Sequence, residues 1–184
     1  MAQKRKDWNG LISGFKASDL VFLDESGCNT DMTRRYADSL GGSRAVDSAP
    51  LSKPKNTTIL SSIQLDGTLR YTTFSGGTTV ERFKRYLETD LLPHLNGNSV
   101  LIMDNMKSHH ARAVRNLLDS SEVRCIYLPP YSPDLNPIEK LWSKVKSFLR
   151  KFKARTLDAL PNAIQCAFQT VSPSDCSGWF HSCG

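Results

Sequence analysis

The chain has 184 residues, of which 39% are hydrophobic and 23% are charged. Such a composition is typical of one soluble globular domain with a hydrophobic core, and no apolar run is long enough for a signal peptide or a membrane span. The chain has five cysteines, an odd number, and no two of them have Cys-x-x-Cys spacing, which argues against a disulfide framework and against a zinc site. We therefore expect a cytoplasmic protein with reduced thiols, no membrane partner and no small-molecule cofactor.

The first residues, 1–18, are polar and basic, and we expect a connector or the remnant of an upstream region there. Residues 19–184 are expected to form a single domain. It begins with the run Asp-Leu-Val-Phe-Leu-Asp at 19–24, which is typical of a strand that is buried on both faces and ends at an acid. Residues 26–56 are expected to be mostly loop, with a short strand near 44–46.

The remaining elements follow from hydrophobic periodicity and turn residues. Asp66-Gly67 lies between two β-branched runs and predicts a hairpin. The expected elements are strands at 57–64 and 69–74, a helix at 78–92, a strand at 100–104, a helix at 108–118, a strand at 123–128, and helices from 136 and over 156–170. This order predicts an α/β, ribonuclease-H-like fold, with a mixed five-stranded sheet flanked by helices and its first and fourth strands adjacent and parallel.

Two acids, Asp24 and Asp104, each close a short apolar run. Either acid alone is more often a turn residue or a helix cap than a functional group. Adjacent parallel strands, however, would bring both carboxylates together at their carboxyl ends, where open α/β sheets place their sites. Glu25 follows Asp24 directly and is expected to point to the opposite face of the strand.

A third acid, Glu139, follows a proline-rich loop that reads Leu-Pro-Pro-Tyr-Ser-Pro-Asp-Leu-Asn-Pro-Ile-Glu over 128–139. The prolines leave the backbone few paths, so the loop is stiff and aims the helix that follows. Asn136 is expected to be the N-cap, with Pro137 as first and Glu139 as third helical residue. A Glu in this position can instead form a capping box, which is the purely structural alternative. Asp134 is a weaker alternative as third acid.

Three converging carboxylates repel one another, and burial increases that cost, so a fold that keeps them together needs a cation. Oxygen ligands favour Mg²⁺ or Mn²⁺, and two such ions about 3.5–4 Å apart are the arrangement used in phosphoryl transfer. The sequence therefore predicts a metal site formed by Asp24, Asp104 and Glu139. The same repulsion predicts that Asp104→Asn leaves the metal-free stability unchanged or raises it.

The formal net charge is +6, and the basic residues are concentrated after Glu139. Residues 140–155 contain seven Lys and Arg side chains and no acid, whereas the apolar residues of this segment recur at helical spacing. A dense cationic face of this kind favours phosphate contact over a merely solvated surface. The expected nucleic-acid-binding residues are Lys140, Lys144, Lys146, Arg150 and Lys151, with Arg34, Arg35 and Arg44 in the segment after the first strand.

These motifs resemble those of DDE transposases of the mariner superfamily, specifically its bacterial insertion-sequence branch. The resemblance rests on Val-Phe-Leu-Asp-Glu-Ser at 21–26, on Met-Asp-Asn at 103–105 followed by His109, and on the loop 128–139. The 34 residues between Asp104 and Glu139 (139 − 104 − 1) are a spacing that this family uses. The resemblance implies that Asp24, Asp104 and Glu139 are the catalytic, metal-binding triad. It also implies that His109 lies near the bound phosphate or the metal, and we expect His109 among the nucleic-acid-binding residues.

The resemblance also implies the substrate and the assembly. Members of the family cleave DNA at the ends of the element and join those ends to target DNA at TA dinucleotides. We expect a homodimer as the active complex. We also expect it in the bacterial cytoplasm, associated with the nucleoid when it is bound to DNA. They carry a helix-turn-helix module ahead of the catalytic domain, but only 23 residues precede Asp24. We expect either a truncated reading frame, an isolated catalytic domain or a chain whose partner supplies recognition. The alternatives in function are a non-catalytic, DNA-binding regulator and a plain nuclease of the same fold.

Overall fold

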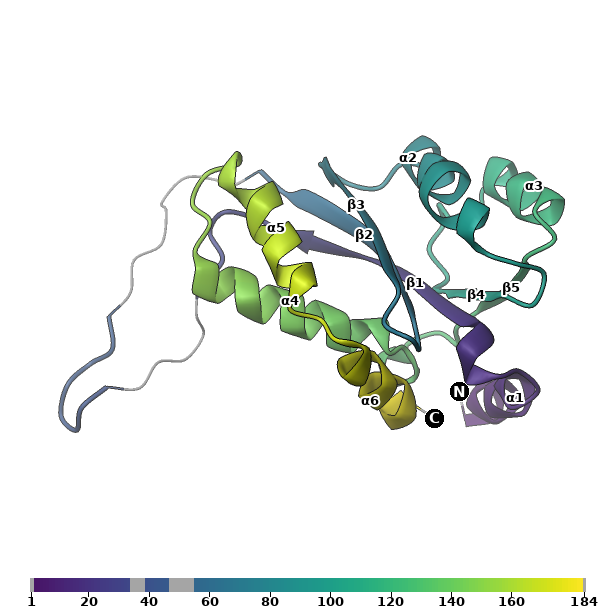
Figure 1. Cartoon of the computed structure of the whole chain (residues 1–184), viewed down its shortest axis with the longest axis horizontal. Helices are drawn as coiled ribbons and strands as arrows, with labels where there is room; N and C mark the ends of the chain where they lie inside the picture. The colour runs from purple at the N-terminus through teal and green to yellow at the C-terminus, as the bar shows by residue number, and fades with distance from the viewer. Residues whose placement is uncertain (1, 34–38, 47–54, 184) are drawn as a thin grey trace.

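The computed structural model describes residues 2–33, 39–46 and 55–183, with only the backbone described at 2–6. Its centre is a five-stranded sheet with the strand order β3-β2-β1-β4-β5 (Figure 1). The strands are β1 (Leu20–Cys28), β2 (Thr57–Gln64), β3 (Leu69–Ser75), β4 (Val100–Met103) and β5 (Arg124–Tyr127). β1 is parallel to β4 and antiparallel to β2. This is the ribonuclease-H-like sheet that the sequence predicts.

The first strand is longer than expected and does not end at Asp24. β1 continues to Cys28, and all residues of this extension pair with β2. β4, in contrast, ends at Met103, which pairs with Leu23. Asp24 therefore lies inside a continuous strand, at the level where its parallel neighbour leaves the sheet. That position holds the backbone of Asp24 rigidly and leaves one side of it open.

The predicted hairpin is confirmed, and its turn requires glycine. Gly67 has φ +92°, and a Cβ atom there would lie 2.9 Å from the Cα atom of Pro173, so both the backbone and the space exclude a side chain. The Asp66 carboxylate accepts a hydrogen bond of 2.8 Å from the Thr68 N–H, which closes the turn. The expected strand at 44–46 is wrong, because the described residues 43–46 are irregular.

Six α-helices are present in the described ranges. They are α1 (Ala2–Ile12), α2 (Val80–Tyr86), α3 (Arg112–Ser120), α4 (Ile138–Phe152), α5 (Ala159–Gln169) and α6 (Pro173–Cys183). The expected helix at 78–92 consists of α2 followed by one π turn and one 3₁₀ turn, which extend it to His94. α3 begins later than expected, because residues 104–106 are irregular and residues 107–110 form a turn.

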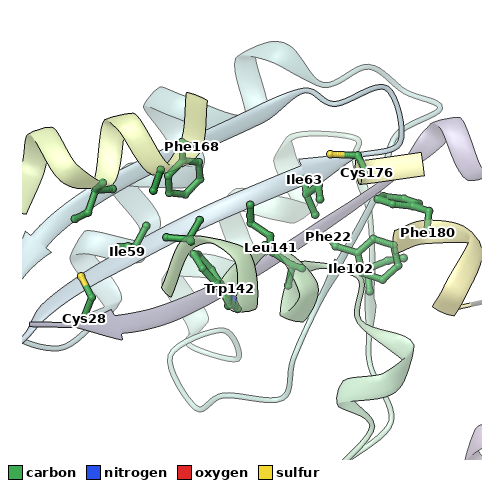
Figure 2. Close-up of a cluster of buried hydrophobic side chains, with 14 of the residues drawn as sticks. Phe22, Cys28, Ile59, Ile63, Ile102, Leu141, Trp142, Phe168, Cys176 and Phe180 are labelled. Carbon is green, nitrogen blue, oxygen red and sulfur yellow. The ribbon is translucent and has the colours of Figure 1, made fainter. Parts of the chain in front are cut away.

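The helices cover both faces of the sheet. Figure 2 shows side chains of α4, α5 and α6, including Leu141, Phe168 and Phe180, packed against Phe22 and Ile59 of the strands. α2 and α3 cover the opposite face, where Leu23 of β1 is buried. Successive residues of β1 thus alternate between two hydrophobic clusters. This confirms the prediction that the first strand is buried on both faces.

Residues 1–18 include a helix that contacts the hydrophobic core. α1 lies in this segment, and its Trp8 is only 6% exposed and belongs to the same hydrophobic cluster as α4 and α6. The apolar side of α1 is only weakly marked in the sequence, because its large apolar residues, Trp8, Leu11 and Ile12, stand beside six polar ones. Where the domain begins stays a prediction. None of the helices in the described part of the chain is long and apolar enough to cross a membrane.

Candidate active site

The three predicted acids line one pocket. Asp24 comes from β1, Asp104 follows β4, and Glu139 lies in the first turn of α4, around a space of about 420 Å³. The rest of the lining comes from the segment after β4 and from the proline-rich loop: Asn105, Met106, Leu128, Pro129, Pro130, Tyr131, Ser132, Pro133 and Asn136. The backbone that brings these segments together is the parallel β1–β4 pair.

Asp24 is the most buried of the three acids, at 8% exposure. Its Oδ1 accepts a hydrogen bond of 2.7 Å from the Glu25 N–H, and its Oδ2 accepts one of 3.1 Å from the indole Nε1–H of Trp142. Burial raises the pKa of Asp24 to about 7, and repulsion from Glu139 and Asp104 adds to this rise, against the two hydrogen bonds. Asp24 is therefore a carboxyl group that a neighbouring cation would help to ionise.

Asp104 has the opposite character. Burial alone would raise its pKa, but hydrogen bonds from His109 and the Met106 N–H outweigh that effect, so the pKa lies below its ordinary value. The imidazole Nδ1 of His109 lies 2.9 Å from Oδ1 of Asp104, which also accepts a 3.1 Å hydrogen bond from the Met106 N–H. Asp104 is therefore held ionised and in a fixed orientation.

His109 was expected near the phosphate or the metal and among the DNA contacts. Its side chain is 0% exposed, and its ring stacks on Phe83 with 4.2 Å between the ring centroids. Its full burial leaves no surface for a direct DNA contact. The described structure gives His109 a supporting role instead, because its ring orients the carboxylate of Asp104.

The capping-box alternative for Glu139 is not formed. No side chain forms a capping hydrogen bond at the start of α4. Pro137, the residue before the helix, has helical backbone angles. The Glu139 N–H donates a hydrogen bond of 3.1 Å to the backbone carbonyl of Asn136. The Asn136 side chain, expected as the N-cap, is 4% exposed, and its Oδ1 has no hydrogen-bond partner among the described residues. The carboxylate of Glu139 is exposed at the pocket, whose lining does not include Asp134 or Glu25.

Two side chains that support the pocket, those of Asn105 and Trp142, were not expected to do so from the sequence. Asn105 donates from Nδ2 to the carbonyl of Leu128 at 2.5 Å and so ties the segment after β4 to the start of the proline-rich loop. Trp142 was assigned only to the apolar face of its helix. Its position three residues after Glu139 was the available signal, because residues at this spacing share a helix face.

The three carboxylates fit a divalent cation by their chemistry. They offer oxygen ligands in one pocket, and repulsion between them contributes to the raised pKa of Asp24. Among the residues that the structure describes, no three His, Cys, Asp or Glu side chains lie close enough to form a ready-made metal site. The three donors thus share a pocket without converging on one point.

The basic residues of α4 do not form one continuous face. Lys140 and Lys151 are exposed along a groove of about 600 Å³ that is lined by α4 and α6. Lys144 lies in the same groove, but its Nζ atom is 2.6 Å from the carboxylate of Asp175. Lys146 and Arg150 are half-buried and do not line this groove.

The expected basic residues after β1 are only partly described. Arg44 is exposed in the irregular residues 43–46. Arg34 and Arg35 lie outside the described residues, so their contact with DNA stays a prediction.

Comparison with known proteins places this geometry in a family. A sequence profile of the DDE superfamily endonucleases matches residues 19–161. The transposable element Tc1 transposase of Caenorhabditis elegans is 29% identical over 97 residues, which cover 50% of this chain and 36% of that protein.

Solved structures share the fold. A pre-cleavage Mos1 transpososome matches with a TM-score of 0.84 at 20% identity, over 100% of this chain and 59% of the Mos1 chain. The catalytic domain of Mos1 mariner transposase matches with a TM-score of 0.74 at 18% identity, over 98% of this chain and 86% of that domain. The chain thus spans 36% of the Tc1 protein and 59% of the transpososome chain. Because the family profile covers most of the sequence and contains all three acids, the chain belongs to the DDE superfamily endonucleases.

Proposed function

We propose that this chain is the catalytic domain of a transposase, which cleaves DNA strands and joins the freed 3′ end to target DNA. The observation that carries the proposal is the single pocket lined by Asp24, Asp104 and Glu139. It is supported by the family membership and by the fold shared with a Mos1 strand transfer complex, at a TM-score of 0.77.

The proposed chemistry is two in-line displacements at phosphorus. In the first, water attacks a phosphodiester and the P–O3′ bond breaks, which leaves a 3′-hydroxyl and a 5′-phosphate. In the second, that 3′-hydroxyl attacks a target phosphodiester and a new P–O bond forms. The P–O3′ bond of the target strand breaks, which leaves a 3′-hydroxyl on the target. Asp24, Asp104 and Glu139 would hold Mg²⁺ or Mn²⁺, as two ions, which when bound activate the attacking oxygen and stabilise the leaving oxygen.

The protein's own contribution is to orient the three carboxylates. His109 and the Met106 N–H hold Asp104, and the rigid strand β1 holds Asp24. Complexes of Mos1 solved with Mn and with Mg support the choice of ions. Glu139 stands on a helix that begins directly after the proline-rich loop, so Asp24 and Glu139 are fixed by a strand and a helix, and Asp104 is fixed by its hydrogen bonds.

The remaining parts of the proposal concern partners and origin. A paired-end complex of Mos1 with a transposon end supports DNA as the substrate, and the active assembly that we propose is a homodimer. The loop sequence 128–139 supports the bacterial insertion-sequence branch, and with it a cytoplasmic, nucleoid-associated protein.

Product analysis on a DNA oligonucleotide with a free 3′-hydroxyl end tests the function. Incubation with target DNA and Mn²⁺ is expected to give a joined product of higher mass. Hydrolysis without joining would indicate a plain nuclease, and DNA binding without any product would indicate a regulator. Either result contradicts the proposed strand transfer.

Replacement of the groove lysines is expected to weaken DNA binding on all sequences alike. Lys140 and Lys151 are exposed in the groove, so each should neutralise about one phosphate. The double variant Lys140→Ala/Lys151→Ala should therefore lower the slope of log K against log salt by roughly 1.8, at 0.9 per phosphate. Fluorescence anisotropy at several salt concentrations measures this slope.

Lys144→Ala is the matched control for that experiment. Lys144 is already paired with Asp175, and hydrogen bonds from Lys144 and Ser172 lower the pKa of Asp175 to about 2. Removal of Lys144 should thus change the slope of log K against log salt less than removal of either exposed lysine. A double variant with the wild-type slope, or a loss confined to one DNA sequence, would contradict the groove as a phosphate-binding surface.

A further inference from the structure

We propose that Trp142 is a positioning residue of the active site, whose indole N–H fixes one oxygen of Asp24 for metal binding. The proposal rests on the proposed function, because it concerns the same three carboxylates. The indole Nε1–H donates to Oδ2 of Asp24 at 3.1 Å. These residues are separated by 118 positions in sequence, so the bond links α4 to β1 across the core.

Burial makes this hydrogen bond consequential. Trp142 is 3% exposed and Asp24 is 8% exposed, so water has little access to either group. A buried indole N–H needs a partner, and the usual partners are neutral carbonyl groups. Here the partner is the carboxylate with the highest cost of burial in the pocket, and the N–H is one of two donors that hold it.

The two donors leave the carboxylate able to bind a cation. Each carboxylate oxygen has two lone-pair sites. The Glu25 N–H occupies one site on Oδ1 and the Trp142 N–H occupies one on Oδ2, so one site on each oxygen remains. Together the donors fix the rotation of the carboxylate, which is the function that outer partners of metal ligands perform.

The helix adds a second element to this arrangement. Glu139 and Trp142 lie three residues apart on α4 and therefore share one side of the helix. Figure 2 shows Trp142 on α4 beside β1, within the cluster that also contains Leu141 and Phe22. One rigid helix thus carries the third acid and the group that orients the first, so a shift of α4 would disturb both.

Trp142→Phe is expected to weaken Mn²⁺ binding by about 10-fold or more. Loss of a group that orients a metal ligand usually lowers the metal affinity by about 10–100-fold. The variant removes the N–H donor and keeps an aromatic ring. Trp8→Phe is the matched control, because it makes the same chemical change in the same hydrophobic cluster, outside the acidic pocket. Isothermal titration with Mn²⁺ alone, without DNA, measures both dissociation constants.

The outcomes separate this proposal from the proposed function. Weaker Mn²⁺ binding in Trp142→Phe and wild-type binding in Trp8→Phe supports the positioning role. Equal Mn²⁺ affinity in Trp142→Phe and wild type would overturn it, while DNA joining by the wild type would leave the proposed function intact. Absence of Mn²⁺ binding and of joining in the wild type would contradict both.

A second measurement serves if Trp142→Phe does not fold. The wild-type protein contains three tryptophans, Trp8, Trp142 and Trp179, whose indole N–H signals can be resolved by ¹H–¹⁵N NMR. The Trp142 signal is expected to shift on addition of Mg²⁺ and to move in Asp24→Asn, while the other two signals stay in place. A Trp142 signal that responds to neither change would overturn the proposal.

Discussion

Replacing Asp24 or Asp104 by Asn, or Glu139 by Gln, is expected to reduce metal-dependent DNA cleavage by about 10³-fold or more. Each change removes one charged ligand from the pocket that the three acids line. Charge stabilisation by bound metal is worth several kcal/mol, and each 1.36 kcal/mol corresponds to a factor of about ten in rate. Cleavage of labelled DNA with Mn²⁺, under single-turnover conditions, measures the loss.

DNA affinity in these variants should stay within a few-fold of wild type, because the exposed lysines of α4 lie in a different groove. Asp134→Asn is the matched control, since Asp134 lies in the proline-rich loop 128–139 before Glu139 but does not line the acidic pocket. It should cleave at close to the wild-type rate. An active Glu139→Gln protein, or an inactive Asp134→Asn protein, would show that Glu139 is not the third acid.

The strands could be predicted from the sequence where their hydrophobic pattern is strong, and they were misjudged where it is weak. Residues 20–23 are apolar and were expected to be a strand. Residues 25–28, Glu-Ser-Gly-Cys, show no such pattern, yet they extend β1, because β2 supplies backbone pairing along their whole length. Sheet pairing of this kind is a tertiary effect that local residue preferences do not contain.

The acids of the site were predictable, but the groups that orient them were not. Asp24, Asp104 and Glu139 each stand in a local motif, and the parallel β1–β4 pairing brings the first two to the same level. The hydrogen bond from Trp142 to Asp24 depends on how α4 packs on β1, which no local pattern specifies. His109 was expected near the bound phosphate or the metal, and its burial could not be predicted either, since its stacking on Phe83 follows from the packing of α2.

The basic segment shows a related limit. Seven cations in 140–155 suggest one cationic face when they are read along the chain. In the structure Lys144 is paired with Asp175, which lies 31 residues away, and only Lys140 and Lys151 are exposed in the groove between α4 and α6. The positive charge available for the proposed DNA contact is therefore set by tertiary pairing as well as by composition.

The second large effect concerns stability in the absence of metal, and it falls on Asp24. Burial raises the pKa of Asp24 from 3.8 to about 7, so the folded protein holds a proton that the unfolded chain releases above pH 4. Stability should therefore decrease as pH rises from about 4 to 7, and the full cost, roughly 4 kcal/mol at 1.36 kcal/mol per pKa unit, is present above pH 7. Asp104 contributes the opposite pH dependence, because its folded-state pKa is lowered. The ionised Asp104 stabilises the folded protein above the ordinary pKa of an aspartate, and this stabilisation is lost as the pH falls through the lowered pKa.

Asp24→Asn in chelator at pH 8 is therefore expected to be more stable than wild type. Removal of the buried charge gains roughly 4 kcal/mol, from which about 1 kcal/mol is lost because the Asn amide can accept only one of the two hydrogen bonds. The sequence alone led us to expect this relief in Asp104→Asn. The structure changes that expectation, because Asp104 is ionised and held by His109, so Asp104→Asn should lower the stability or leave it unchanged.

Thermal melts at pH 5 and pH 8, in chelator and in Mn²⁺, test these expectations with the two Asp→Asn variants as a matched pair. At pH 8, Mn²⁺ at 100 times its dissociation constant should stabilise wild type by about 2.7 kcal/mol, and Asp24→Asn should lose most of this gain. The gain should be smaller at pH 5, because the ligand must release its proton before it binds the cation. If Asp24→Asn melts below wild type in chelator at pH 8 and still gains the full Mn²⁺ shift, then Asp24 is a structural carboxylate and the metal lies elsewhere.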